Sequence, residues 1–205
     1  TLLIPASFEI VYKAPGIPKR KLRLENPSTK ISSLTNLFLA TIKGKVIGIT
    51  GTKGKSTTAS LIYEILKGGG YKSVLVGNIG IAAITKLEED SPVTWYVYEM
   101  SSFQCELLDR SPHIAVTTNL FDEHFDHHGS KESYWEAKKK ITQFQTEDDY
   151  LLVPEEIGIE TKAKKVVISK PGRRFETKLS GAHNQMNIAI ARTVGQVLSI
   201  PEETM

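Results

Sequence analysis

The pattern of apolar and polar positions predicts a repeated strand–helix order from about residue 44 onward. Short apolar runs between turn-forming residues are typical of buried strands, and apolar positions three and four residues apart are typical of amphipathic helices. The expected strands are residues 46–50, 73–76, 94–98, 114–118, 150–153 and 165–168, and the expected helices are residues 55–66, 103–108, 131–144 and 183–198. This order predicts an α/β fold with a mainly parallel sheet and helices on both faces.

The first 41 residues have a different pattern. They hold an Ala-Pro-Gly-Ile-Pro turn at residues 14–18, a basic run at residues 19–21 and an amphipathic stretch at residues 31–42. We interpret residues 1–41 as the tail of a preceding N-terminal domain with a linker helix, and residues 42–205 as the main domain. The chain begins without Met and ends just after Pro201. We therefore expect it to be a fragment of a longer protein.

The clearest chemical signature lies between the first two elements of the main domain. An apolar strand runs into Gly51-Thr52-Lys53-Gly54-Lys55-Ser56-Thr57, where a helix is expected to begin. A strand, a glycine-rich turn and a Lys-Ser pair form the layout of a phosphate-binding loop (P-loop), in which backbone N–H groups and the helix N-terminus bind phosphate. Lys55 can then reach the outer phosphates and Ser56 can ligate Mg²⁺. The strict pattern has glycine in place of Ile49, so this P-loop is a variant.

Two polar motifs directly follow other predicted strands. Ligands of such sheets bind at the carboxyl ends of the strands. Gly77-Asn78-Ile79-Gly80 is either an ordinary turn or a tight loop that directs the Asn78 amide into the cleft. Glu99 ends the next strand, where a carboxylate is well placed to hold the Mg²⁺ of a nucleotide. Ser101 and Ser102, which follow it, can equally be helix caps.

The segment after the fourth strand is rich in titratable residues. Asp122-Glu123-His124-Phe125-Asp126-His127-His128 holds three acidic residues and three histidines within seven positions. It is either a solvated acidic loop or part of a site. A zinc site is the rival interpretation, but cysteines are missing and the spacing matches no standard zinc pattern. His124 lies nearest the end of the strand and is the preferred candidate.

The last two predicted helices carry further candidates. Tyr134, Ala137, Ile141 and Phe144 define the buried stripe of one helix, with Lys138-Lys139-Lys140 beside it. Lys139 points away from the stripe, whereas Lys138 and Lys140 flank it, so a flanking lysine could enter the cleft although a solvated face is the commoner arrangement. Gly181-Ala182-His183-Asn184-Gln185-Met186-Asn187 opens the other helix. Capping explains one asparagine, whereas Asn184 and Asn187 together with His183 suggest contact with a ligand, with its base as the candidate group.

Composition narrows the class of protein. Hydrophobic residues make up 40% of the chain, which is enough for a core, and the net charge is only +3, which does not favour a nucleic-acid partner. Basic runs at residues 19–23 and 162–174 lack interleaved aromatic residues. Cys105 is the single cysteine, so an intrachain disulfide is excluded. No apolar run approaches the roughly 20 residues of a membrane-spanning helix, and a signal peptide is not recognisable. We expect a cytoplasmic protein with no membrane span.

Taken in this order, the motifs resemble the Mur ligase family. The matching segments are the P-loop, Gly77 to Gly80, Glu99-Met100-Ser101-Ser102-Phe103-Gln104, Asp122 to Asp126, residues 134–138, residues 181–187 and the turn at residues 14–18. The Glu-Met-Ser-Ser-Phe-Gln segment favours the glutamate-adding branch of the family. The folylpolyglutamate synthetases have a similar loop and are the alternative.

The resemblance implies a three-domain protein. Its first domain binds a UDP-sugar precursor, its central domain binds ATP, and its third domain closes over the site. Residues 42–205 would be the central ATP-binding domain, and the C-terminal domain would be absent. The resemblance implies ATP binding by residues Gly51, Thr52, Lys53, Gly54, Lys55, Ser56, Thr57, Asn78, Asn184 and Asn187, with Lys55, His124 and Lys138 as catalytic residues. Ser56 and Glu99 would hold one Mg²⁺, and His124 a second. Lys138 would be carbamylated by CO₂ and would join the metal site.

The implied reaction is ATP-dependent addition of D-glutamate to UDP-N-acetylmuramoyl-L-alanine through an acyl-phosphate, a step of peptidoglycan-precursor synthesis. We expect the fragment to bind ATP without completing the reaction and the parent protein to be a monomer. The alternatives are another Mur-type or folylpolyglutamate-synthetase-like ligase, or a non-catalytic ATP-binding module.

Overall fold

A computed structural model describes residues 1–121, 130–172 and 174–205. Within these residues, six strands form one sheet in the order β10-β9-β8-β5-β7-β6, and every neighbouring pair is parallel. The strands are β5 (Lys45–Thr50), β6 (Ser73–Gly77), β7 (Trp95–Glu99), β8 (Ile114–Thr117), β9 (Tyr150–Pro154) and β10 (Lys164–Ile168). The predicted α/β fold is confirmed, because each strand agrees with its predicted range to within one residue at either end.

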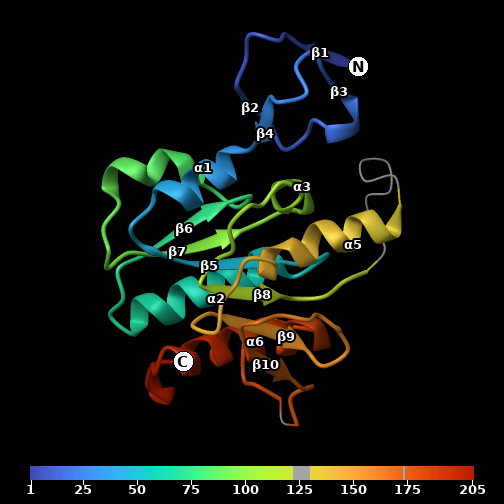
Figure 1. The fold of residues 1–205 in the computed structure, drawn as a ribbon. Coiled ribbons are helices and arrows are strands. Elements are labelled where there is room, and N and C mark those ends of the chain that lie inside the picture. Colours follow the sequence, from blue (N-terminus) through green and yellow to red (C-terminus); the bar gives the residue numbers. More distant parts are fainter. Residues whose placement is uncertain (122–129, 173) are drawn as a thin grey trace.

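Helices cover both faces of this sheet (Figure 1). On one face lie α1 (Leu34–Thr41), the 3₁₀ helix η2 (Ala83–Glu89), α3 (Ser102–Cys105) and α5 (Lys131–Lys139), which packs on α3. On the other face α2 (Lys55–Gly68) packs against α6 (Ala182–Val197). Two buried apolar clusters fill the space between the layers, one around Phe38 and Tyr96 and the other around Ile47, Ile62 and Ile190. A 3₁₀ turn η4 (Glu202–Thr204) ends the chain.

Two predicted helices are shorter than expected. The helix predicted at residues 103–108 is the single turn α3, because the Asn36 side chain bonds both Leu107 O and Asp109 N and so takes up groups that a longer helix would use. The helix predicted at residues 131–144 ends at Lys139 and continues as the 3₁₀ turn η3 (Lys140–Thr142), a common tightening at helix ends.

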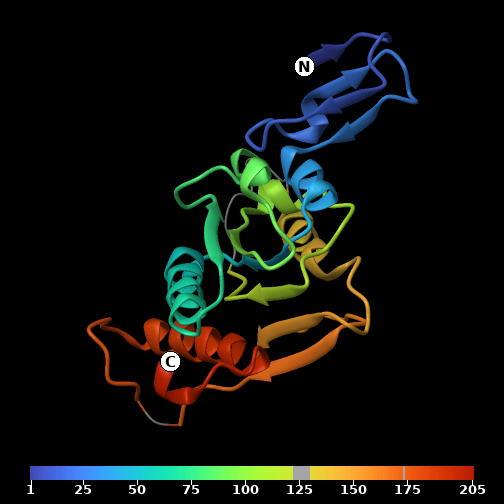
Figure 2. The ribbon, with the colours of Figure 1, turned by 90° about the vertical axis from the view of Figure 1, so that its left-hand side faces the viewer.

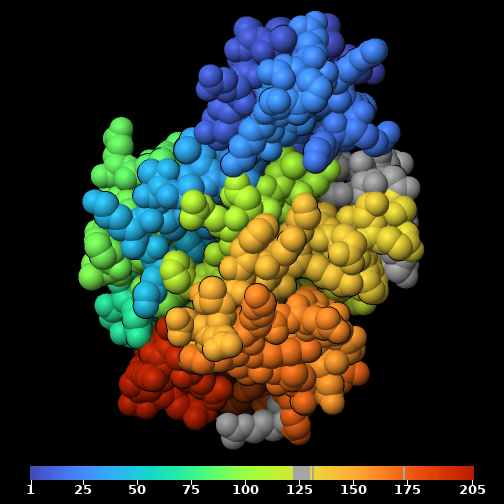
Figure 3. All heavy atoms as spheres, in the orientation of Figure 1, coloured from blue at the N-terminus to red at the C-terminus, as the bar shows by residue number. Residues whose placement is uncertain are grey.

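The first 33 residues form a separate small unit, the N-terminal module. It consists of two parallel strand pairs, β1 with β3 and β2 with β4, and a 3₁₀ turn η1. Their bounds are β1 (Leu2–Ile4), β2 (Ile10–Tyr12), η1 (Lys19–Lys21), β3 (Leu22–Leu24) and β4 (Lys30–Ser32). The module projects from the main body beyond α1 (Figures 2 and 3). The amphipathic stretch at residues 31–42 is therefore divided, with β4 first and then α1, which Ser33 caps.

Helix α1 packs within the main core. The fully buried Phe38 ring meets Tyr96 and Tyr98 edge-on, with ring centres 5.1 Å and 5.7 Å apart. The domain boundary at residue 41 stays a prediction.

The order of the strands places one crevice at the centre of the sheet. From β5 the chain builds β6 and β7 on one side, then crosses to build β8, β9 and β10 on the other. Ligands of open parallel sheets bind at such a switch point, outside the carboxyl ends of the strands. The pairing of Thr50 with Thr117 and of Ile49 with Glu99 brings the P-loop and Glu99 to this edge. None of the helices in the described residues is long and apolar enough to cross a membrane.

Candidate nucleotide-binding site

The P-loop connects β5 directly to α2. Gly54 is the N-cap of α2 and has a φ of +80°, a left-handed conformation that favours glycine. Lys55 Nζ donates to Gly51 O at 2.9 Å and to Thr52 O at 2.8 Å. The ammonium group therefore lies over the turn itself, where P-loops hold phosphate.

Residues that follow β8 fix the shape of the P-loop. Asn119 Oδ1 accepts hydrogen bonds from the backbone N–H groups of Thr52 at 3.1 Å and Lys53 at 2.8 Å. Asn119 Nδ2 and Thr118 Oγ1 each donate to Lys53 O at 2.7 Å. The sequence pattern does not single out Thr118 and Asn119. The available signal was their position, because they are the first polar residues after the strand that pairs with β5.

Helix α5 closes the P-loop from the other side. Thr52 Oγ1 lies 3.0 Å from the Tyr134 hydroxyl and also bonds both backbone groups of Phe121. Lys138 is only 3% exposed, its Nζ donates to Gly51 O at 2.7 Å, and the same Nζ lies 4.7 Å from the centre of the Tyr134 ring. Of the three consecutive lysines, Lys138 is thus the one that packs into the site. Lys139 pairs with Glu136 on the surface.

A buried carboxylate lies beside the start of α2. Glu99 is 1% exposed, and its Oε2 and Oε1 accept hydrogen bonds from Ser56 Oγ at 2.9 Å and Asn78 Nδ2 at 3.2 Å. A side chain at Gly77, which has a φ of +106°, would collide with Glu99 O and the Tyr98 ring. Glycine at this position therefore lets the chain turn so that Asn78 reaches Glu99. The carboxylate and hydroxyl oxygens of Glu99 and Ser56 are the ligands that Mg²⁺ prefers, so this pair fits the predicted metal.

No group of three His, Cys, Asp or Glu side chains is clustered for metal binding among the residues that the structure describes. A metal held by Ser56 and Glu99 would therefore take most of its ligands from phosphate and water, as nucleotide-bound Mg²⁺ does. The candidate His124, together with the rest of the acidic segment at residues 122–128, lies outside the described residues.

An open cleft of about 880 Å³ extends from the P-loop to the start of α6. Its walls come from five segments at the same edge of the sheet, and they include Lys53, Gly54, Thr118, Asn119, Phe121, Glu156, Lys170, Arg174, His183, Gln185 and Asn187. This volume lies in the range of small-molecule and cofactor sites, roughly 300–1,000 Å³. Glu156 lies in a segment without a recognisable motif, and Lys170 and Arg174 belong to the basic run at residues 162–174, which the sequence did not connect with the site.

Of the two asparagines of α6, Asn187 lines the cleft and Asn184 lies beside it. Asn187 is buried against Gly54 and lines the cleft, and its Nδ2 donates to Asn184 Oδ1 at 3.1 Å. Asn184 Nδ2 donates to Ser180 O at 2.7 Å, which holds the residue beside the cleft wall. The structure thus brings Lys53, Gly54, Asn187 and His183 to one cleft, and it gathers Lys55, Ser56, Asn78, Glu99 and Lys138 around the P-loop. The short helix α3 confirms a structural role for Ser101, whose side chain forms a capping box with Gln104.

Comparison with known proteins agrees with this arrangement. The model of the Mur ligase middle domain matches residues 49–168. A UDP-N-acetylmuramoylalanine–D-glutamate ligase of Geobacillus kaustophilus is 44% identical over 155 residues, which are 74% of this chain and 34% of that protein. The ligase of the same name from Symbiobacterium thermophilum is 33% identical, over 91% of this chain and 49% of that protein.

Solved structures share the fold at lower identity. The MurF ligase of Thermotoga maritima in complex with ADP superposes with a TM-score of 0.63 at 18% identity, over 88% of this chain and 54% of that one. Escherichia coli FolC in complex with ADP gives 0.59 at 16% identity, over 83% of this chain and 58% of that one.

The chain spans about a third to a half of the length of these curated relatives. The matched residues 49–168 contain the P-loop, Asn78, Glu99 and Lys138, which gather at the carboxyl ends of β5 and β7. The chain belongs to the Mur ligase middle-domain family.

Proposed function

We propose that this chain is the ATP-binding part of a ligase that adds D-glutamate to UDP-N-acetylmuramoyl-L-alanine. The observation that carries the proposal is the contact of the buried Glu99 carboxylate with Ser56, directly beside a P-loop and an open cleft. The named relatives at 33–44% identity support the choice of D-glutamate as the added amino acid. The alternative acceptors of a Mur-type or folylpolyglutamate-type ligase are outcomes of the test below.

The residues have distinct parts in the proposed site. The backbone N–H groups of the P-loop and the Lys55 ammonium would bind the β- and γ-phosphates of ATP and neutralise the charge that spreads over the transferring phosphoryl group. Asn78 would contact phosphate, and Asn187 and His183 would line the nucleoside end of the cleft. Ser56 and Glu99 would hold Mg²⁺, which supplies charge neutralisation when it is bound.

Lys138 is proposed to be carbamylated. A carbamate turns the buried ammonium into an anion with two additional oxygens and keeps one N–H, which can continue to donate to Gly51 O. An anion beside the P-loop suits a Mg²⁺-containing site better than a second cation does. His124 would be a ligand of a second Mg²⁺, as the resemblance to the family implies.

The chemistry is then two successive displacements. The carboxylate of the precursor attacks the γ-phosphorus of ATP, which forms an acyl-phosphate and releases ADP. The amine of D-glutamate attacks the acyl carbon, and the tetrahedral adduct collapses with loss of phosphate and a proton. Positioning of the reactants and electrostatic stabilisation supply most of the rate of such reactions.

Phosphate release by the full-length parent tests the proposal. With ATP, Mg²⁺ and UDP-N-acetylmuramoyl-L-alanine, we expect release that depends on D-glutamate and that responds to bicarbonate once CO₂ is depleted. Lys55→Ala should abolish it, whereas Lys67→Ala, an exposed lysine on the same helix, should leave it unchanged. Release with a different amino acid would keep the mechanism and change the acceptor. Full activity of the Lys55→Ala variant would contradict the proposed role of the P-loop.

A further inference from the structure

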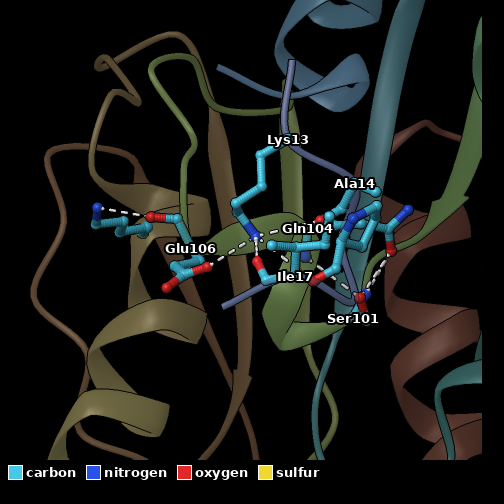
Figure 4. Close-up of polar contacts among 8 residues, drawn as sticks. Lys13, Ala14, Ile17, Ser101, Gln104 and Glu106 are labelled. Atoms are coloured by element: carbon cyan, nitrogen blue, oxygen red, sulfur yellow. Dashed lines mark hydrogen bonds and ion pairs between the residues drawn. The ribbon is translucent and has the colours of Figure 1, made fainter. Parts of the chain in front are cut away.

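One buried lysine ammonium belongs to the N-terminal module and not to the P-loop site. The side chain of Lys13, in the N-terminal module, is 1% exposed. Its Nζ donates to Ile17 O at 2.7 Å and lies 3.4 Å and 3.5 Å from the carbonyl oxygens of Ala14 and Pro15 (Figure 4). The Pro-Gly turn at residues 14–18 thus wraps around this ammonium, and the lysine organises the turn from within.

The same ammonium forms an ion pair across the boundary of the module. Lys13 Nζ lies 3.2 Å from Oε2 of Glu106, whose side chain is 22% exposed and which directly follows α3. Burying such a pair is expensive in desolvation, so it adds little net stability compared with apolar side chains, but removing one partner is strongly unfavourable. The expected effect of this pair is on the orientation of the N-terminal module relative to the main domain more than on the net stability of their contact.

Further contacts gather on the segment that begins with Glu106. Asn36, on α1, bonds Leu107 O and Asp109 N. From the opposite side, Lys140 Nζ donates to Glu106 O at 2.9 Å. Lys30 of the module pairs with Asp109 at 3.3 Å, but these side chains are 63% and 40% exposed. An ion pair that is this exposed contributes little to stability.

The same segment is close in the chain to the candidate metal ligand. The capping box of α3 joins Ser101 to Gln104, and Ser101 follows Glu99 by two residues (Figure 4). Lys140 follows Lys138 by two residues. Glu106 is therefore linked by one helical turn to Glu99 and by one hydrogen bond to the helix end that carries Lys138.

We propose that Lys13 is a positioning residue that fixes the N-terminal module on the nucleotide-binding domain through its ion pair with Glu106. This step rests on the proposed function: a precursor held by the first domain must present its carboxylate in line with the γ-phosphate. The position of the Pro-Gly turn relative to α3 then sets the approach of the carboxylate to the phosphate, while nucleotide binding depends on residues outside the N-terminal module, in the P-loop and the cleft beside α6.

The orientation of the module can be measured in this chain. Spin labels are attached at Ser7→Cys in the module and Gln196→Cys on α6, both exposed, while native Cys105 is buried. Pulsed electron paramagnetic resonance should give one narrow distance distribution for the otherwise unchanged chain and for Lys30→Met, which removes the exposed pair. Lys13→Met should give a broader or shifted distribution. Unchanged distances in Lys13→Met would overturn the proposal.

Kinetics of the full-length parent supply a second readout. Lys13→Met should lower kcat by a factor of about 100, the loss that a misplacement of about 1 Å can cause. The Kd for Mg-ATP should stay unchanged, Lys13→Arg should recover part of the loss, and Lys30→Met should behave as wild type. An equal loss of ATP affinity would overturn the proposal, because it would show a general structural role for Lys13.

Two controls keep these outcomes distinct. If Lys13→Met does not fold, Glu106→Gln, which keeps size and an acceptor oxygen, must give the same broadened distances, and narrow distances would overturn the proposal. If the parent shows no phosphate release that depends on an amino acid, the proposed function fails. The label distances in this chain still decide whether Lys13 fixes the module.

Discussion

Gly54 offers a direct test of how the P-loop meets α6. A Cβ atom at this position would lie 2.5 Å from Asn187 Oδ1 and 3.1 Å from Asn187 Nδ2, and residue 54 would have to keep a φ of +80°. Gly70, just beyond the other end of α2, has nearly the same φ of +79° but nothing within 4 Å of its Cβ position. The substitutions Gly54→Ala and Gly70→Ala therefore share the backbone strain and differ in the collision with Asn187.

The expected magnitudes follow from that comparison. Holding an L-residue in the left-handed region costs roughly 1–2 kcal/mol, which for a chain of this size lowers the Tm by about 3–6 °C. Displacement of the buried Asn187 adds about 1–2 kcal/mol, because it removes packing and a hydrogen bond to Asn184. Gly54→Ala should therefore lower the Tm by about 6–12 °C, or twice the effect of Gly70→Ala.

Thermal unfolding followed by circular dichroism, with calorimetric titration of Mg-ATP, measures both effects. Gly54→Ala should weaken Mg-ATP binding by at least about tenfold. Shifting the P-loop would cost at least one hydrogen bond from its backbone N–H groups to phosphate, and one good hydrogen bond corresponds to about that factor. Gly70→Ala should leave binding unchanged. Combining Gly54→Ala with Asn187→Ala should cost less than the sum of the single changes, because the collision is relieved. Equal effects of Gly54→Ala and Gly70→Ala on Tm and on affinity would refute the reasoning.

Three other predictions concern single side chains. Glu99→Gln keeps the shape of the site and removes its charge, so Mg-ATP should bind no better than ATP does after removal of Mg²⁺ by EDTA; a retained Mg²⁺ dependence in calorimetry would count against the assigned ligand. Burial raises the pKa of the Cys105 thiol to about 11, although nearby Lys138 lowers it, so a thiol reagent at pH 8 should react only after unfolding, and rapid reaction of the folded chain would contradict the structure. Partial burial acts to raise the pKa of Asp90, but three backbone N–H groups and the Tyr96 hydroxyl hold it below its ordinary value of 3.8. The stability that these bonds add is present above pH 3.8 and is lost as the pH falls through the lowered pKa. The difference in free energy of unfolding between wild type and Asp90→Asn, measured in urea, should therefore shrink below pH 3.8. A difference that stays constant with pH would refute this assignment.

The sheet could be predicted from sequence because its strands are short apolar runs bounded by turns. The P-loop and Glu99 were also predictable, since the sites of parallel sheets lie where strands end and these motifs stand at strand ends. In contrast, β1 to β4 escaped prediction because each has only three residues, which is too short for the apolar run or the alternation that predicts a strand.

The other features that could not be predicted from the sequence depend on tertiary contacts. Asn36 ends α3 early through contacts that join residues some 70 positions apart, which no local pattern encodes. The same holds for Asn119, which shapes a P-loop that precedes it by more than 60 residues. Lys138 could not be distinguished from Lys140 by periodicity, because both flank the apolar stripe. Only the packing of α5 on the P-loop shows that Lys138 meets Gly51 whereas Lys140 meets Glu106.

The location of the nucleotide is the central claim, and an NMR titration of the isotopically labelled chain with Mg-ADP tests it most directly. We expect the largest amide shifts in two segments that lie far apart in sequence, the P-loop at residues 51–57 and the start of α6 at residues 182–187. The N-terminal module should change little. Binding that shifts other residues and leaves both segments unperturbed, or no binding at all, would contradict the account.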